Sequence, residues 1–398
     1  MVNVLVLGAG RVGKSVAELL LACGRGAYSV TLADRDETNL QRARENLSRL
    51  GDRLGRPVQF ATRQLDASDP AAMRDALKGH EYVICMLPFN CVAGVADLAN
   101  ELGVHYFDVT EDVETTERVR AIEASGRAKV ALVPQCGLAP GYIAIAAHHV
   151  AKRFEKIHSL TLRVGALPQY PTNALKYNVT WSAAGVVNEY CEPCNVMLGG
   201  KMVKVPALEG LENFSFEGVE YEAFYTSGGV GTLIETLVEE GRTGPETAIA
   251  YKTIRYPGHR DLMKFLLEDL RLGSETDPRF NRATAVELLE HGVPRTLQDV
   301  IVVFINGVGT FPGSPIPQQV NFHRSIRAVE LLGRTWPGIE LTTSAGVCAM
   351  VDLHRQGKLP RTGLIRQEQC DLELFNQTVF GLAYENPEGL EAAVAGRA

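Results

Sequence analysis

A glycine-rich turn near the N-terminus has the spacing of a dinucleotide-binding site. Gly8, Gly10 and Gly13 form a G-x-G-x-x-G pattern directly after an apolar run and directly before a helical pattern. The first glycine allows a tight turn, the second lets a pyrophosphate approach the backbone, and the third lets the helix pack closely on the strand. Free backbone N–H groups at the start of that helix, where Arg11 and Val12 stand, would face the phosphates.

An acidic residue stands where the adenosine ribose would bind. Asp34 ends the second predicted strand, 21 residues beyond Gly13, and its carboxylate can accept hydrogen bonds from ribose hydroxyls. A carboxylate there repels a 2′-phosphate, so the pattern favours NAD as the cofactor. NADP stays possible, because Arg35 can pair with the phosphate if Asp34 turns away. The alternative for Arg35 is a solvated surface cation.

Three further candidates follow the ends of predicted strands. Asp66 comes after the third strand, and Leu87 and Pro88 come after the fourth. In an open α/β sheet the ligand crevice lies at the carboxyl ends of the strands. We therefore expect these residues to border the cofactor, although Asp66 is equally suited to a turn.

These candidates require a parallel sheet to position them. Short β-branched runs alternate with helical patterns up to about residue 136, which is typical of successive βαβ units. The fold class is therefore α/β, with a Rossmann doubly wound parallel sheet in residues 1–136. The expected strands are 2–7, 28–33, 58–61, 82–87, 105–109 and 129–133.

A different pattern begins after Pro140-Gly141. Residues 157–164 alternate apolar and polar side chains, as a half-exposed antiparallel strand does. We predict a second α+β domain, residues 137–339, built on a mixed sheet. Its further strands are expected at 216–225, 248–256 and 299–306, its helices at 183–192 and 259–272, and a loop or lid at 310–320. A capped helix is expected at 342–357, and the sequence alone does not assign it to either domain.

Composition excludes several classes of partner. The chain has 398 residues and a net charge of −7, which argues against a broad surface for nucleic acid or anionic membrane. No basic leader and no apolar run of about 18 residues is visible. We expect a cytoplasmic protein with reduced cysteines.

No metal site is predicted. Cys191 and Cys194 form a lone C-x-x-C with no second Cys/His pair at zinc-like spacing. His148 and His149 are adjacent on a helix and face two directions. Cys136 is expected to be a buried, inert thiol.

Several motifs in order indicate a family. They are Leu87-Pro88-Phe89, Gly137-Leu138-Ala139-Pro140-Gly141, Tyr225-Thr226-Ser227-Gly228-Gly229 and Tyr251-Lys252-Thr253-Ile254-Arg255-Tyr256-Pro257-Gly258-His259. With these motifs the chain resembles the saccharopine dehydrogenase family, which includes saccharopine reductases and lysine 6-dehydrogenases. The resemblance implies hydride transfer from a carbon–nitrogen bond of an amino acid to a nicotinamide, followed by hydrolysis of the imine. It also implies that residues of about 340–398 complete the Rossmann domain, and that the middle domain supplies a homodimer interface.

The resemblance assigns a role to several residues of the second domain. Arg255 matches an arginine similar to the family's substrate-carboxylate binder, and a guanidinium suits that role because it gives two parallel N–H bonds. Its alternative is an interdomain ion pair. Tyr177 and Trp181 resemble an aromatic stretch near the substrate, with a packed aromatic pair as the alternative.

Two departures keep the substrate open. Ala139 and Phe89 stand where saccharopine reductases often have a carboxylate and a phenol, and Tyr225 stands where lysine 6-dehydrogenases have a histidine. Amine oxidation needs a group that accepts a proton. The candidates are Tyr225, Lys252, His259 and Asp108, and spacing chooses none of them.

The sequence therefore predicts an NAD(P)-dependent oxidoreductase of amino-acid and lysine metabolism that acts on a C–N bond. The alternatives are L-lysine 6-dehydrogenase, a carboxyspermidine-type reductase, and a catalytically silent nucleotide-binding scaffold.

Overall fold

The chain builds two units, each with its own sheet. The computed structural model describes residues 1–394. One unit comprises Met1–Tyr142, Glu330–Arg334 and the chain from Glu340 onward, and the other comprises Ile143–Val329 and Thr335–Ile339. No helix of the described residues is long and apolar enough to cross a membrane.

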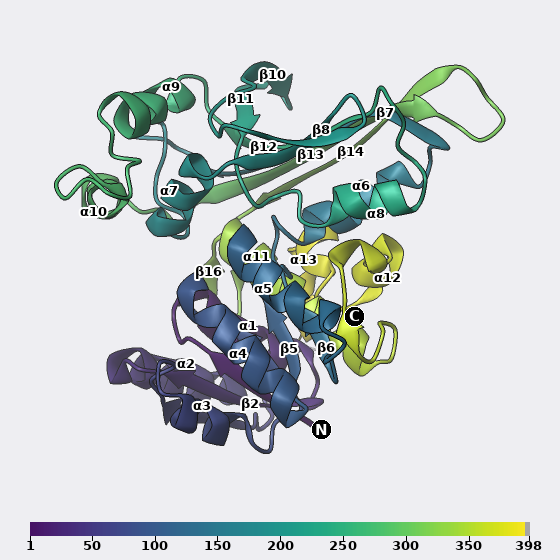
Figure 1. The fold of residues 1–398 in the computed structure, drawn as a ribbon. Helices are drawn as coiled ribbons and strands as arrows, with labels where there is room; N and C mark the ends of the chain where they lie inside the picture. The colour runs from purple at the N-terminus through teal and green to yellow at the C-terminus, as the bar shows by residue number, and fades with distance from the viewer. Residues whose placement is uncertain (395–398) are drawn as a thin grey trace. The chain divides into compact units, whose positions relative to one another are not determined.

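The first unit is built on a parallel sheet of seven strands (Figure 1). The strand order is β17-β6-β5-β4-β1-β2-β3. Apart from the added β17, this is the order of a Rossmann fold, in which the chain reverses direction across the sheet between β1 and β4. The strands are β1 (Val2–Leu7), β2 (Tyr28–Asp34), β3 (Phe60–Gln64), β4 (Tyr82–Cys85), β5 (His105–Asp108), β6 (Ala131–Val133) and β17 (Gly363–Leu364).

Helices connect these strands, and local signals set their ends. The Asp36 carboxylate caps α2 by accepting from Thr38 N, and Gly55 ends that helix in the left-handed conformation. Asp69 caps α3 with Pro70 at its first position. The helices are α1 (Arg11–Cys23), α2 (Glu37–Leu54), α3 (Pro70–Leu77), α4 (Phe89–Leu102), α5 (Val113–Ala124), α11 (Gly338–Arg355), α12 (Leu372–Gln377), α13 (Leu382–Glu385) and α14 (Gly389–Val394).

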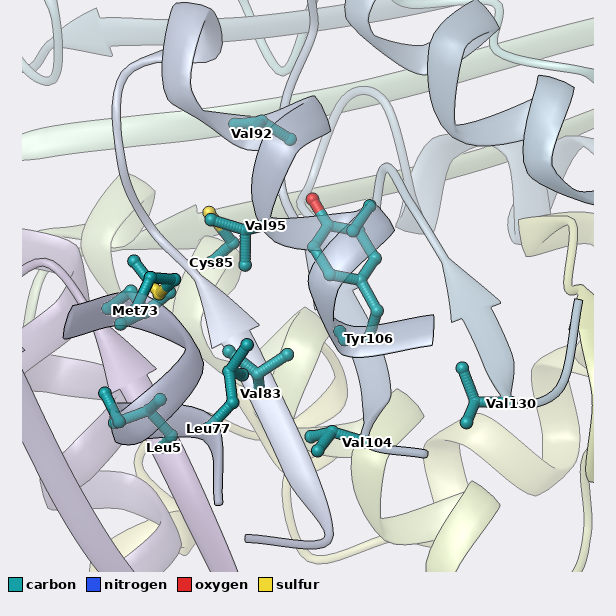
Figure 2. Packing of buried hydrophobic residues seen from close by; sticks show 14 of the residues in the cluster. Leu5, Met73, Leu77, Val83, Cys85, Val92, Val95, Val104, Tyr106 and Val130 are labelled. Atoms are coloured by element: carbon teal, nitrogen blue, oxygen red, sulfur yellow. The ribbon is translucent and has the colours of Figure 1, made fainter. Parts of the chain in front are cut away.

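One face of the parallel sheet packs against α3, α4 and α5. Leu5, Val83 and Tyr106 point from β1, β4 and β5 toward Met73 of α3 and Val95 of α4, as Figure 2 shows. All five side chains are buried. This apolar layer fixes β1 beside β4, so the turns that follow the two strands lie at the same edge of the sheet.

The second unit is built on a mixed sheet, with strand order β10-β11-β12-β7-β13-β14 and the β8–β9 hairpin joined to β12. Only β12 and β7 pair in parallel along this path; the other pairs are antiparallel. The strands are β7 (Lys156–Pro168), β8 (Cys194–Leu198), β9 (Lys201–Val205), β10 (Glu212–Phe216), β11 (Val219–Tyr225), β12 (Ala248–Arg255), β13 (Asp299–Thr310) and β14 (Pro317–Arg327). The helices are α6 (Tyr142–Ala151), α7 (Ala183–Cys191), α8 (Leu233–Glu239), α9 (His259–Lys264), a π-helical turn (Phe265–Asp269) and α10 (Arg282–Gly292). The predicted fold class is confirmed in both units.

Several predicted elements need correction. Of the segment 310–320, which was predicted as a loop or lid, only residues 311–316 form a loop; they connect β13 and β14 at the tip of a long hairpin, in which Thr310 pairs with Pro317. Proline there starts an edge strand, a position that needs no ladder hydrogen bond from its nitrogen. The third strand is Phe60–Gln64, not 58–61.

The helix predicted from residue 342 begins earlier, at Gly338. The carboxylate of Asp299 accepts hydrogen bonds from Gly338 N (2.5 Å) and Ile339 N (3.0 Å). This cap comes from a residue 39 positions away in the sequence, so no local signal reveals it.

Candidate active site

The turn between β1 and α1 is shaped by two glycines that admit no side chain. Gly8 has φ +98°, and a Cβ on it would lie 2.8 Å from the Met86 carbonyl oxygen. A Cβ on Gly13 would lie 1.8 Å from the Gly8 carbonyl oxygen. Both positions therefore require glycine for the turn itself.

Gly10 differs, because a Cβ there would have nothing within 4 Å. It is the N-cap residue of α1 and, as a glycine, has no side chain to cap the N–H groups at the start of that helix. These groups carry the positive end of the helix dipole. Open space at the second glycine, next to uncapped N–H groups, fits a pyrophosphate.

Asp34 lies beside this turn and binds its backbone. Its Oδ2 accepts from Ala9 N (2.6 Å), and its Oδ1 accepts from Asp36 N (2.8 Å). The carboxylate therefore ties the end of β2 to the glycine turn. Arg35, the next residue, is exposed, so its guanidinium is available to a ligand at that edge.

Three more predicted residues lie at the carboxyl edge of the sheet. Asp66 is exposed and accepts from Ser68 N (2.9 Å) and Ser68 Oγ (2.7 Å), which is the turn chemistry weighed as its alternative. These bonds lower the pKa of Asp66. Leu87 Cδ2 lies 3.6 Å from the point where a Cβ on Gly8 would stand. Pro88 precedes α4.

A buried ionic cluster that the sequence did not indicate supports α1. The Arg334 guanidinium donates to Glu18 Oε2 (2.9 Å) and Glu340 Oε1 (2.7 Å). Ser15 of α1 donates to the same Glu340 oxygen, and Arg11 Nε lies 4.0 Å from the other. Burial raises the pKa of Glu18. The cluster links α1, the helix that follows the glycine turn, to the start of α11. The sequence does not reveal it because its residues are far apart along the chain.

Asp108, at the end of β5, is fully buried and accepts three hydrogen bonds. The donors are Tyr106 Oη (2.7 Å), Gln135 N (2.9 Å) and Thr110 N (3.0 Å). Burial nevertheless raises the pKa of Asp108 to about 6. The three donors fix this carboxyl in place, so its position is that of a structural acceptor.

In the second unit, Arg255 lies inside an aromatic cluster. Its side chain is buried, and the guanidinium carbon lies 5.1 Å from the Tyr177 ring centre and 5.8 Å from the Tyr190 ring centre. Nε donates to Tyr190 Oη (2.8 Å), and Nη1 donates to the Ile254 carbonyl (2.9 Å). The structure thus brings Arg255 and Tyr177 together, and Trp181 packs at the edge of the same cluster.

His259 also belongs to this cluster. Its Nε2 lies 3.1 Å from Tyr190 Oη, and its Nδ1 lies 3.0 Å from the Leu175 carbonyl oxygen. Burial lowers the pKa of His259 to about 3, and the charge on Arg255 adds to this effect. Both ring nitrogens are engaged, so His259 does not fit the role of proton acceptor that the sequence left open.

Tyr225 and Lys252, two of the candidate proton acceptors, do not lie in the cluster around Arg255 and Tyr177. They pair across β11 and β12, on the sheet face opposite to Arg255. Lys252 Nζ donates to the Gly210 carbonyl (2.7 Å), pairs with Glu212 Oε2 (3.1 Å) and lies 5.1 Å from the Tyr225 ring centre. Burial lowers the pKa of Lys252. These contacts describe a packed ionic pair.

The cysteines and histidines form no ligand set. Within residues 1–394, no group of three or more His, Cys, Asp or Glu side chains is placed to hold a metal ion. Cys191 and Cys194 are free thiols, and burial raises the pKa of Cys191 to about 11. Cys136 is likewise free and buried.

Comparison with known proteins agrees with this arrangement of two domains. Residues 4–133 match the saccharopine dehydrogenase NADP binding domain, and residues 137–335 match the saccharopine dehydrogenase C-terminal domain. The chain is 24% identical over 279 residues to saccharopine dehydrogenase [NADP(+), L-glutamate-forming] of Schizosaccharomyces pombe, a match over 67% of this chain. It spans only 58% of the length of that relative.

A solved structure shows the same fold. It is apo saccharopine dehydrogenase (L-Glu forming) from Saccharomyces cerevisiae, with a TM-score of 0.72 and 18% identity. The similarity covers 96% of this chain and 97% of the yeast chain. Since the two family models together span nearly all of residues 4–335, the chain belongs to the saccharopine dehydrogenase family of oxidoreductases.

Proposed function

We propose that this protein is a nicotinamide-dependent oxidoreductase that acts on the C–N bond of an amino acid, with saccharopine as the first substrate to test. Membership of the family and the name of the Schizosaccharomyces pombe relative support this reaction class. L-Lysine 6-dehydrogenase and a carboxyspermidine-type reductase are the rival activities. All three substrates are amines that carry a carboxylate.

The observation that carries the proposal is the environment of Arg255. The side chain is only 3% exposed, and its guanidinium donates hydrogen bonds to the Tyr190 phenol and the Ile254 carbonyl, which are neutral groups. Among the described residues, no carboxylate lies within ion-pair distance of it. The charge on Glu189 favours the charged guanidinium from beyond ion-pair distance. A buried cation without a close counter-ion is still costly unless a ligand supplies negative charge beside it. A substrate carboxylate would do so and would be held in a fixed orientation.

We propose NADP as the coenzyme, in place of the NAD that the position of Asp34 suggested. The names of the matched domain and of the relative point to NADP. Both Asp34 oxygens already accept backbone hydrogen bonds, so this carboxylate has a structural role in the turn. The exposed Arg35 is the cation that would pair with a 2′-phosphate.

Residues of the first unit would bind the coenzyme, and residues of the second unit would bind the amino acid. The turn Gly8–Gly13 and the start of α1 would hold the pyrophosphate, with Leu87 and Pro88 at the same sheet edge. When bound, the nicotinamide supplies hydride transfer. Arg255 would orient the amino acid by its carboxylate, and the rings of Tyr177 and Tyr190 would keep water from the guanidinium faces.

A substrate screen tests this function. The protein is incubated with NADP or NAD and with saccharopine, lysine or carboxyspermidine, and absorbance at the reduced-nicotinamide band is followed. Turnover that is fastest with saccharopine and NADP supports the proposal. Turnover with lysine alone would show that the protein is an L-lysine 6-dehydrogenase. Turnover with carboxyspermidine alone would show that it is a carboxyspermidine-type reductase.

The same experiment distinguishes an enzyme from a catalytically silent nucleotide-binding scaffold. Coenzyme binding by calorimetry without turnover of any of the three amines would favour the scaffold. Failure of both coenzymes to bind would overturn the redox proposal altogether.

We also propose that the protein is a homodimer that pairs through β14. This strand of 11 residues is an edge of the second sheet, and most of its side chains are exposed or half-exposed. An unpaired edge strand is a template for pairing with another chain. Light scattering after size-exclusion chromatography should give twice the mass of one chain, and a single-chain mass at micromolar concentration would contradict the proposal.

A further inference from the structure

A directional series of hydrogen bonds runs from Arg255 through Tyr190 to His259. A guanidinium only donates, so Tyr190 Oη accepts from Arg255 Nε (2.8 Å). A carbonyl only accepts, so the proton of His259 lies on Nδ1, which donates to the Leu175 carbonyl (3.0 Å). His259 Nε2 is then a lone-pair acceptor, and the Tyr190 hydroxyl donates to it (3.1 Å).

The surroundings allow no other direction for these bonds. His259 is 0% exposed and Tyr190 is 2% exposed, so water does not compete for either ring. Burial lowers the pKa of His259 to about 3 and raises the pKa of Tyr190. Both rings therefore stay neutral around pH 7, and each has one donor and one acceptor in use.

The series leaves one edge of Arg255 for a ligand. Nε is bound by Tyr190, and Nη1 donates to the Ile254 carbonyl (2.9 Å). Nη2 makes no hydrogen bond to any of residues 1–394. The Tyr177 and Tyr190 rings lie near the guanidinium carbon. The rotation of the guanidinium is thus set by Tyr190.

We call the hydrogen bonds from Arg255 through Tyr190 to His259 the relay. Backbone and helix contacts hold Tyr190 and His259 in place. Tyr190 lies in the last turn of α7, and the N-cap residue of that helix is Ser182, whose Oγ accepts from Gly185 N (3.1 Å). His259 begins α9, and the Glu222 carboxylate accepts from Gly258 N (2.8 Å) and Arg260 N (2.6 Å) on either side of it. The hydrogen bonds therefore connect the last turn of α7 and the first residue of α9 to one side chain of β12.

We propose that Tyr190 and His259 are positioning residues, which aim the free edge of Arg255 at a substrate carboxylate without touching the reacting atoms. This inference rests on the proposed function, because it takes Arg255 as the carboxylate binder. It identifies Tyr190, which no sequence motif indicated, as the residue on which the affinity for the carboxylate depends.

Tyr190→Phe tests the relay while keeping the ring. We expect the KM for the amino-acid substrate to rise at least about tenfold, since a hydrogen bond to a charged group is lost. The kcat should stay within about twofold and the coenzyme Kd should not change. Tyr256→Phe is the matched control, because it also removes a tyrosine hydroxyl that donates a hydrogen bond, in this case to the Pro168 carbonyl (2.8 Å), but on the opposite face of the sheet.

Two substitutions of His259 separate positioning from packing. His259→Gln keeps an amide acceptor for the Tyr190 hydroxyl, whereas His259→Phe keeps only ring volume. The proposal expects KM to be restored toward wild type in His259→Gln and raised in His259→Phe. Equal loss of thermal stability in both variants, with KM unchanged in each, would show a purely structural role and overturn it.

A measurement without substrate separates failure of the relay from failure of the proposed function. In ¹⁵N NMR spectra of the intact protein, Arg255 Nε–H should exchange slowly with water, and Tyr190→Phe should accelerate this exchange at least about tenfold. His259 should show the neutral Nδ1–H form from pH 5 to 8. A His259 signal that titrates near pH 6.5 would overturn the relay even if turnover is found. An intact relay in a protein that turns over no amine would instead refute the function, and with it the positioning role.

Discussion

Lys252 and Arg255 are three residues apart on β12 and lie on opposite faces of the sheet. Side chains alternate along a strand, so an odd separation places them on different faces. Ile254, on the Lys252 side, packs with Leu167 and Tyr221, whereas Arg255 contacts Tyr177 and Tyr190. A motif that is continuous in sequence therefore contributes to two separate environments.

Replacement of Arg255 by lysine tests the first of these environments. Arg255→Lys keeps a positive charge but loses the planar fork, so it cannot keep the bond to Tyr190 and also bind a carboxylate at two points. We expect kcat/KM for the amino acid to fall about 100-fold, or about 3 kcal/mol. Steady-state kinetics with calorimetry of the coenzyme measures this. A loss of coenzyme affinity of equal size would show that Arg255 supports the fold instead.

Replacement of Lys252 tests the second environment. Lys252→Met removes the pair with Glu212 and the bond to the Gly210 carbonyl, and Arg163 still binds Glu212 (2.5 Å). We expect kcat/KM to stay within about threefold and the free energy of unfolding to fall by about 1 to 3 kcal/mol. Loss of kcat by about 100-fold or more in a folded variant would restore Lys252 as a candidate base.

The glycine turn was predictable because its signals are local. Strand, turn and helix follow one another within residues 2–23, and Gly13 is required by the carbonyl of Gly8 in the same turn. The motif around Arg255 was also predictable, because its residues are continuous in the sequence. However, alternation along the strand only separates Lys252 from Arg255; it does not tell which face packs against Tyr177 and Tyr190, because those residues come from distant segments.

The remaining features depend on contacts between distant segments. Tyr190 lies 65 residues before Arg255, and Arg334 binds Glu18 across 316 residues. A single sequence read by itself has no signal for such pairs. The Asp299 cap of α11 was missed for the same reason, and the helix start was placed four residues too late.

Two glycines of the turn should respond differently to alanine. At Gly10 the φ of −66° suits alanine and no atom lies within 4 Å of the new Cβ, so the unit should fold. The methyl group would occupy the space proposed for the pyrophosphate, and we expect the coenzyme Kd to rise at least about tenfold. Gly13→Ala would force a carbon onto the Gly8 carbonyl and cost about 3 kcal/mol or more. Calorimetry and thermal unfolding of both variants measure these effects; an unchanged coenzyme Kd in Gly10→Ala would refute the proposed site.

Arg35 should decide between the two coenzymes. Its removal in Arg35→Ala takes away the cation proposed to pair with the 2′-phosphate, so the KM for NADP should rise at least about tenfold while that for NAD stays within about twofold. The control is Arg63→Ala. Arg63 lies on the neighbouring strand β3, and its guanidinium pairs with Asp75. A wild-type protein that prefers NAD, and an Arg35→Ala variant with an unaltered preference, would return Asp34 to the role first inferred from the sequence.

Acid should destabilise the second unit through His259. The folded-state pKa of His259 is lowered from 6.5 to about 3, mainly by burial. The unfolded chain therefore binds a proton below pH 6.5 that the folded chain refuses until about pH 3. The stability contribution of the neutral ring is fully present above pH 6.5 and is lost as the pH falls toward 3, by about 1.4 kcal/mol for each pH unit.

His259→Gln removes this titration, so its stability relative to wild type should improve by about 2 kcal/mol between pH 7 and pH 5. Denaturant unfolding at a series of pH values measures the difference, and His291→Gln, an exposed histidine, is the control that should leave it unchanged. Parallel pH profiles for wild type and His259→Gln would mean that His259 titrates normally in the folded protein, and that the direction of its hydrogen bonds is not fixed.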